Sequence, residues 1–168
     1  MTSIRHRLLV DECLPPALID NYLAPHIRIT KDGVEPIHFF DRFGIGGGIK
    51  DPVWVPKIAR DRRWLILSAD RGKKGSLAES LPLVCEQFGV TLITMTNPIK
   101  EQGLAFYGPQ ILSHWRRFMA AAQGAKGAQY FIRRHSSKTA TTLFVVHKCP
   151  EGFIAHSGEC IPVKPKKT

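Results

Sequence analysis

The sequence of 168 residues lacks any long hydrophobic run. No segment approaches the roughly 20 consecutive apolar residues that a membrane-spanning helix needs, so we expect no membrane partner. The first residues are basic, but Asp11 comes too soon for the apolar core of a signal peptide. We therefore expect a cytoplasmic chain, long enough for one domain and a small extension.

Cysteine is also scarce. The sequence has four: Cys13, Cys85, Cys149 and Cys160. The first two lie in apolar contexts, which predicts small buried side chains. The last two, together with His147 and His156, lack the closely spaced ligand pair of a zinc motif. We expect a loosely ordered tail there, without zinc and without a disulfide, since a disulfide requires an oxidising compartment.

Acidic residues become rare toward the end of the chain. The net charge is +10, of which residues 126–168 carry +6 and residues 1–125 carry +4. A basic excess of this size favours a polyanionic partner, nucleic acid first, because binding releases counterions. A solubilising surface or an acidic protein partner remains an alternative.

Apolar runs alternate with helical patterns along residues 1–124. Strands are predicted at residues 5–12, 35–43, 63–70 and 90–96, and helices at residues 15–25, 51–59, 76–89 and 109–124. Pro56 fits badly inside a helix, so the regular part of the second helix is expected to begin there. Because the strands are continuously apolar, the pattern predicts an α/β fold with a parallel sheet of about four to five strands, flanked by helices on both faces.

The pattern changes after Gly124. Residues 128–135 and 141–148 are expected to form an antiparallel pair around a Ser-Ser-Lys turn, followed by a proline-rich, basic end. We therefore divide the chain into residues 1–124, an α/β domain, and residues 125–168, a C-terminal β-hairpin extension and tail.

Acids stand at the ends of the predicted strands. Asp11 and Glu12 end the first, Asp70 ends the third, and Asp51 begins the helix that leads into the third. In open α/β sheets, ligand sites form at the carboxyl ends of the strands. Carboxylates that converge there repel one another unless a cation lies among them, and oxygen ligands of this kind suit Mg²⁺ or Mn²⁺.

Each acid also has a local explanation. Asp51 followed by Pro52 is typical of a helix N-cap, and Asp70 before Gly72 is typical of a turn. Glu12 is expected to face away from Asp11, because side chains alternate along a strand. Nothing local explains an acid after the run Leu8–Val10, so Asp11 is the strongest candidate for a ligand.

The segments LLVDECLPPAL, DPVWVPKIARDRRWLILSADR and GVTLITMT resemble the PIN-domain superfamily, in particular the small PIN-like proteins related to VapC toxins. In those relatives a first strand ends in Asp-Glu before a Leu-Pro segment, a later Asp begins a helix, and the next strand ends in Ser or Thr, one residue, then Asp. The resemblance spans residues 8 to 120.

The resemblance implies a metal-dependent ribonuclease, often the toxin of a toxin–antitoxin pair, with an antitoxin partner and often a homodimer. By resemblance, Asp11, Asp51 and Asp70 are the catalytic, Mg²⁺- or Mn²⁺-binding carboxylates, and Glu12 is a further ligand. Many PIN proteins carry another acid two residues after the strand-end Asp, where this chain has Gly72. That departure leaves open an alternative: a PIN scaffold with weak or no catalysis that binds nucleic acid or protein.

The cations that follow Asp70, and two arginine pairs later in the chain, are candidates for binding the RNA backbone. They comprise Arg71, Lys73, Lys74, Arg116, Arg117, Arg133 and Arg134. Tyr130 and Phe131 lie beside the last pair and could add stacking, although core positions are the simpler explanation for both aromatic side chains. A solvated loop is the alternative for the first three cations.

Overall fold

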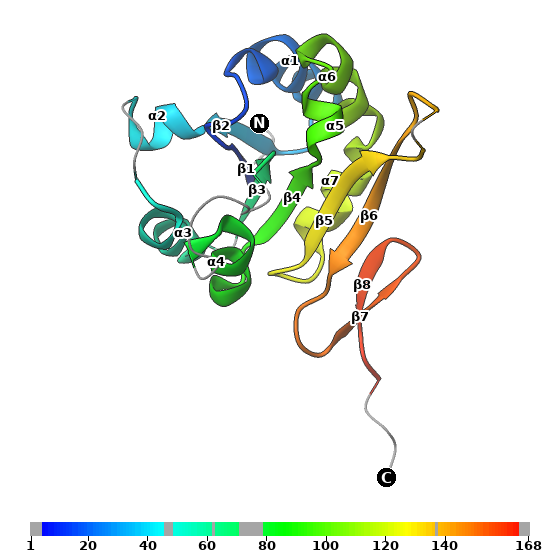
Figure 1. The fold of residues 1–168 in the computed structure, drawn as a ribbon. Coiled ribbons are helices and arrows are strands. Elements are labelled where there is room, and N and C mark those ends of the chain that lie inside the picture. Colours follow the sequence, from blue (N-terminus) through cyan, green and yellow to red (C-terminus); the bar gives the residue numbers. More distant parts are fainter. Residues whose placement is uncertain (1–4, 46–48, 62, 71–78, 137, 165–168) are drawn as a thin grey trace.

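The computed structural model describes residues 5–45, 49–61, 63–70, 79–136 and 138–164. A six-stranded sheet with the order β2-β1-β3-β4-β5-β6 forms its centre (Figure 1). The strands are β1 His6–Val10, β2 Val34–His38, β3 Trp64–Ser68, β4 Thr91–Met95, β5 Gln129–Arg134 and β6 Thr142–Lys148. The first five are parallel to one another, and β6 is antiparallel to β5. The predicted α/β fold with a parallel sheet and a C-terminal hairpin is confirmed.

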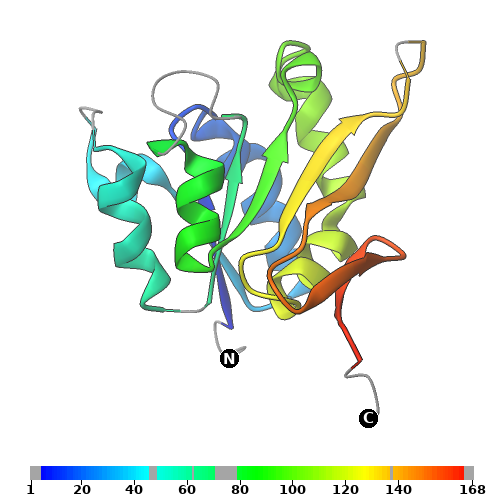
Figure 2. The same ribbon diagram turned by 60° about the horizontal axis from the view of Figure 1, so that its bottom comes forward.

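Helices cover both faces of the sheet (Figures 1 and 2). The helical elements are the π-helix η1 Ile19–Leu23, α1 Ala24–Thr30, α2 Phe39–Phe43, α3 Asp51–Ala59, α4 Leu81–Phe88, α5 Asn97–Lys100, α6 Leu104–Ser113 and α7 Trp115–Gln123. Residues of α1, α6 and α7 share one apolar cluster with one face of the sheet, and α3 and α4 share a second cluster with the other face.

Alternation along the strands decides which side chains join which cluster. In β3, Leu65 and Leu67 belong to the cluster with α7, whereas Trp64 and Ile66 belong to the cluster with α3 and α4. Every residue of β3 and of β4 is buried. This explains why the sequence shows continuous apolar runs there instead of the alternation of a half-exposed strand.

Three helix predictions were wrong in detail. Helix α3 begins at Asp51 and continues through Pro56, and the first helical segment continues through Pro25 into α1. The helix expected over residues 109–124 is two helices, α6 and α7, with a break at His114 (φ −98°, ψ 10°). Pro109 lies inside α6, so this proline does not start a helix.

The second strand is shorter than predicted. It ends at His38, and residues 39–43 form α2. The imidazole of His38 explains the change, because its Nδ1 accepts the N–H of Phe40 and so caps the new helix. Its Nε2 donates to the carbonyl of Leu14 at 2.7 Å, which ties this corner to the loop that follows β1.

The C-terminal part is more ordered than predicted. Strands β7 Phe153–His156 and β8 Glu159–Pro162 form a second, two-stranded sheet beyond the end of β6. Cys149 and Cys160 are joined by a disulfide, contrary to the prediction, because the hairpin folds back until their Cα atoms are 5.6 Å apart. Strands β5 and β6 extend the central sheet, and the boundary near Gly124 stays a prediction. Among the described residues, no helix is both long and apolar enough to cross a membrane.

Candidate active site

Asp11 is buried at the carboxyl end of β1, with 7% of its surface exposed. Its Oδ2 accepts the hydroxyl of Ser68 at 2.6 Å, and its Oδ1 accepts the backbone N–H of Glu12 at 2.8 Å. Burial raises the pKa of Asp11 above its ordinary value. The negative charge of Asp70 raises the same pKa further, whereas the hydrogen bonds act in the opposite direction. The carboxylate is therefore fixed in place but poorly compensated for its charge.

Ser68, which is fully buried, connects Asp11 to Asp70. While its hydroxyl donates to Asp11, its oxygen accepts the backbone N–H of Asp70 at 2.9 Å. One side chain thus sets both the orientation of a carboxylate on β1 and the path of the chain after β3. The sequence pointed to Ser68 only through the resemblance; its position two residues before an Asp does not reveal the partner on β1.

Cys13 also belongs to this cluster, and the sequence interpretation as a simple apolar side chain missed its contacts. Its Sγ lies 3.5 Å from Asp11 Oδ2 and 3.5 Å from Ser68 Oγ, and it accepts the N–H of Ala69 at 3.2 Å. Burial and the charge of Asp11 raise the pKa of Cys13 to about 11. The thiol therefore stays protonated near neutral pH and acts as a hydrogen-bond donor to Asp11, not as a nucleophile.

Asp51 is the first residue of α3, and its carboxylate is close enough to Asp11 and Asp70 to feel the charges of both. Its carboxylate accepts the indole N–H of Trp54 at 2.9 Å and makes no side-chain cap to the helix backbone; the cap position is Lys50. The interpretation of Asp51 as an N-cap is therefore wrong. Burial raises the pKa of Asp51 to about 6, and the charges of Asp11, Asp70 and Glu12 add to the increase. The predicted acids thus lie close enough to repel one another.

Asp70 and Glu12 are exposed beside the buried Asp11 and the half-buried Asp51. The predicted cations Arg71, Lys73 and Lys74, together with Gly72, lie outside the described residues. No ion pair joins a Lys or Arg of the described residues to Asp11 or Asp51. The carboxylates of Asp11 and Asp51 are therefore held by neutral donors.

These carboxylates suit a metal ion that keeps several water molecules among its ligands. The described residues contain no group of three His, Cys, Asp or Glu side chains already arranged to hold a metal. Mg²⁺ is commonly bound through one or two carboxylates, with water completing its shell. A buried carboxylate with a raised pKa beside two further acids is the donor set that such an ion would stabilise.

Three of the four predicted RNA-binding arginines lie on the face of the sheet that α7 covers, and Arg133 lies on the other face. Arg116 and Arg117 are exposed on α7, and Arg117 donates to the carbonyl of Ser157 at 3.2 Å. Arg133 is exposed on β5, and Arg134 donates to the carbonyl of Thr139 at 3.4 Å. Arg133 and Arg134 are the last residues of β5, so both lie at the carboxyl end of a sheet strand.

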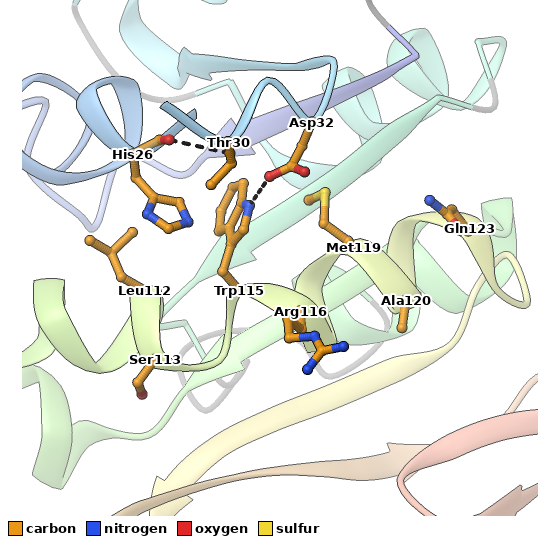
Figure 3. A pocket seen from close by; sticks show the side chains of 10 residues that line it. All are labelled: His26, Thr30, Asp32, Leu112, Ser113, Trp115, Arg116, Met119, Ala120 and Gln123. Carbon is orange, nitrogen blue, oxygen red and sulfur yellow. Dashed lines mark hydrogen bonds between the residues drawn. The ribbon is translucent and has the colours of Figure 1, made fainter. Parts of the chain in front are cut away.

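A cavity of about 580 Å³ lies between α1 and the α6–α7 segment (Figure 3). The indole N–H of Trp115 donates to Asp32 at 2.7 Å at its centre, and His26 and Met119 flank the indole. Arg116 lines the same cavity. None of its lining residues is one of the strand-end acids, so the cavity is separate from the carboxylate cluster.

The sequence matches the PIN-like domain family over residues 7–90, which is half of the chain. The chain belongs to the PIN-like domain family. The matched segment contains Asp11, Asp51, Ser68 and Asp70, so the whole carboxylate cluster lies within it. A search of curated proteins and a search of solved structures found no match. Members of the PIN superfamily are often nucleases and generally use divalent metals.

Proposed function

We propose that this PIN-like domain is a metal-dependent ribonuclease. The observation that carries the proposal is the state of Asp11: a buried carboxylate, fixed by Ser68 and Glu12, with a pKa raised by burial and by Asp70. Burying a charge without a cation costs free energy. A carboxylate held in this way at the carboxyl edge of the sheet supports the proposal that a divalent cation binds there.

In this proposal Asp11, Asp51 and Asp70 hold Mg²⁺ or Mn²⁺, and Glu12 is a further ligand. When bound, the ion lowers the pKa of a coordinated water molecule and offsets the charge on the phosphodiester. Ser68 and Cys13 orient the carboxylate of Asp11. Trp54 orients the carboxylate of Asp51. Arg71, Lys73 and Lys74, which follow Asp70 in the sequence, are the cations proposed to position the phosphate backbone.

Cleavage of a fluorescent single-stranded RNA in Mn²⁺ tests the proposal. Asp11→Asn and Asp70→Asn keep the size of each side chain and remove the charge, so we expect each to reduce the rate at least 100-fold. Asp61→Asn is the matched control, because Asp61 lies beyond the opposite end of β3 and pairs with Arg63 at 2.7 Å. Cleavage that persists in EDTA, or equal rates for Asp11→Asn and Asp61→Asn, would contradict the proposal.

A second candidate is an RNA-binding module without catalysis. Two observations favour it: the described residues hold no preformed group of three metal ligands, and Gly72 replaces a further acid. The same variants separate the two functions. A module that only binds keeps its RNA affinity in Asp11→Asn, or gains some, because removing a negative charge eases the approach of phosphate.

The toxin role, the antitoxin partner and a homodimer are finer proposals that rest on the resemblance to VapC-related proteins. A toxin of this kind should arrest growth when expressed alone and lose that effect when its antitoxin is co-expressed. We expect growth arrest from the wild type and none from Asp11→Asn. Equal growth of cells that express either protein would contradict the toxin role.

A further inference from the structure

The two faces of the β5–β6 pair differ in what covers them. On one face Tyr130, Ile132 and Phe144 are buried, at 3%, 0% and 8% exposure, against α7. On the other face Phe131 and Val145 are only half-buried. In Figure 1, α7 lies behind β5 and β6, and no helix of the described chain lies in front of them. No helix of the described residues covers this face, which we call the hairpin platform: Phe131, Arg133, Leu143, Val145 and His147.

The charged residues of the β5–β6 segment are all basic. Residues 129–148 contain Arg133, Arg134, Lys138 and Lys148, and no Asp or Glu. Lys148 is paired with Glu86 of α4 at 2.6 Å, and Arg134 is engaged with the turn between the strands. Arg133 points from the platform face and is exposed. This charge complements a phosphate backbone.

An aromatic stack lies at the centre of the platform. The rings of Phe131 and His147 are 4.1 Å apart and nearly parallel, at 15°. Phe131 supports one face of the imidazole, and His147 is an exposed residue. The opposite face of the imidazole is therefore available to a flat partner. Nucleobases stack on such rings regardless of sequence, because every base has a π face.

The platform and the serine that holds Asp11 share one face of the sheet. Ser68 of β3 is in register with Thr94 of β4, Thr94 with Phe131 of β5, and Phe131 with Val145 of β6. Residues in register point to the same face of a sheet, so the row runs from the serine that holds Asp11 directly to the platform. Since neighbouring strands are about 4.8 Å apart, the row from Ser68 to Phe131 spans roughly 10 Å. Arg133 lies two residues further along β5, toward the edge where Asp70 stands.

We infer that the hairpin platform binds a single-stranded segment of RNA, with a base stacked on His147 and a phosphate on Arg133. The bound strand then continues from Arg133 along the carboxyl edge of the sheet toward Asp70, because Ser68 and Thr94 themselves are buried. Cleavage of that strand rests on the proposed function, whereas its binding does not. A single strand is the occupant because bases in a duplex are already stacked on each other and cannot reach the imidazole.

Fluorescence anisotropy with a labelled single-stranded RNA of 12 nucleotides, in EDTA to prevent cleavage, tests this inference. We expect His147→Ala to weaken binding about tenfold, as for the loss of one base–aromatic stack. His147→Phe should bind like the wild type, since it keeps a flat ring. Arg133→Ala should weaken binding and reduce the slope of log affinity against log salt by about one. The matched control is Arg28→Ala, which removes an exposed arginine from α1 on the opposite face.

An abasic oligomer of the same length separates stacking from charge. It carries the phosphates without the bases, so we expect wild type and His147→Ala to bind it equally. Unchanged RNA affinity in His147→Ala, equal losses on RNA and on the abasic oligomer, or equal affinity of the wild type for duplex RNA would each overturn the inference. Melting temperatures of all variants confirm that they fold. If the wild type cleaves no RNA while His147→Ala still shows the expected loss of binding, the nuclease proposal alone is overturned.

Discussion

Acids at the amino ends of the sheet strands have arginine partners, whereas Asp11 and Asp51 at the carboxyl ends have neutral ones. At the amino ends, Asp61 accepts the guanidinium of Arg63 at 2.7 Å, and Arg7 lies between Asp61 at 3.6 Å and Glu35 at 3.3 Å. The hydrogen bonds from Arg63 lower the pKa of Asp61. At the carboxyl ends, Asp11 and Asp51 are held by neutral donors, and burial raises the pKa of both.

This difference shows which acids serve stability and which do not. A carboxylate paired with arginine at the surface stabilises the folded state slightly. A buried carboxylate with a raised pKa destabilises it when ionised. Two carboxylates with raised pKa values at one edge, in a chain with a net charge of +10, are not explained by folding alone. Both ends of the sheet can be tested by the same kind of substitution.

The largest effect should come from metal binding. We expect Mn²⁺ at about 100 times its dissociation constant to stabilise the wild type by about 2.7 kcal/mol, which corresponds to an increase in Tm of roughly 5 to 10 °C. Asp11→Asn should lose this increase, because it removes a ligand, and Asp61→Asn should keep it. Thermal melts with and without Mn²⁺ measure the difference. An equal increase in both variants would place the ion elsewhere.

Replacing Ser68 by alanine should destabilise the protein by about 2 kcal/mol, since buried polar groups are left without partners. The change removes the donor to Asp11 and the acceptor for the N–H of Asp70. Ser113→Ala is the control: its hydroxyl is exposed and donates to the carbonyl of Gln110, so the cost should stay below about 0.5 kcal/mol. Urea unfolding of both variants provides the comparison, and equal midpoints would contradict it.

Replacing Asp51 by asparagine should stabilise the metal-free protein. Its pKa is about 6 in the folded state, above the ordinary 3.8, so the ionised carboxylate is unfavourable above about pH 6 and this cost disappears below about pH 4. We expect a gain of about 1 kcal/mol at pH 7.5, reduced from the full shift because the group is partly exposed, and little gain at pH 4. Melts in EDTA at both pH values measure it; a loss of stability at pH 7.5 would contradict the account.

Asp61→Asn should have the smallest effect and the opposite sign. The pKa of Asp61 is lowered in the folded state, so its contribution is present above the ordinary pKa and is lost as the pH falls through the folded value. We expect a loss of about 0.5 kcal/mol at pH 7 that shrinks below pH 4. The same loss should shrink in 1 M salt, where the ion pairs are screened. A loss independent of both pH and salt would indicate a packing defect instead.

The strands and the edge where the acids meet could be predicted from the sequence, because continuous apolar runs indicate buried parallel strands and acids follow them directly. Helix ends were harder. No glycine or proline marks the break at His114, and the prolines at positions 25, 56 and 109 lie within helices. Proline is a poor guide to helix ends where tertiary packing stabilises the continuing helix.

The partners of the site residues could not be predicted either. Asp51 looked like an N-cap, yet it binds the indole of Trp54; Cys13 looked purely apolar, yet its thiol contacts Asp11. These contacts depend on which side chains packing brings together between β1, β3 and α3. The same is true of the Cys149–Cys160 disulfide, which needs the return of the β7–β8 hairpin.

The most direct test of the account is a crystal structure of the protein soaked in Mn²⁺, with the ion located by its anomalous scattering. The account predicts one strong peak at the carboxyl edge, bound by oxygens of Asp11, Asp51 and Asp70 and by water. No peak at this edge, or a peak only at exposed acids such as Asp61 and Glu35, would contradict it.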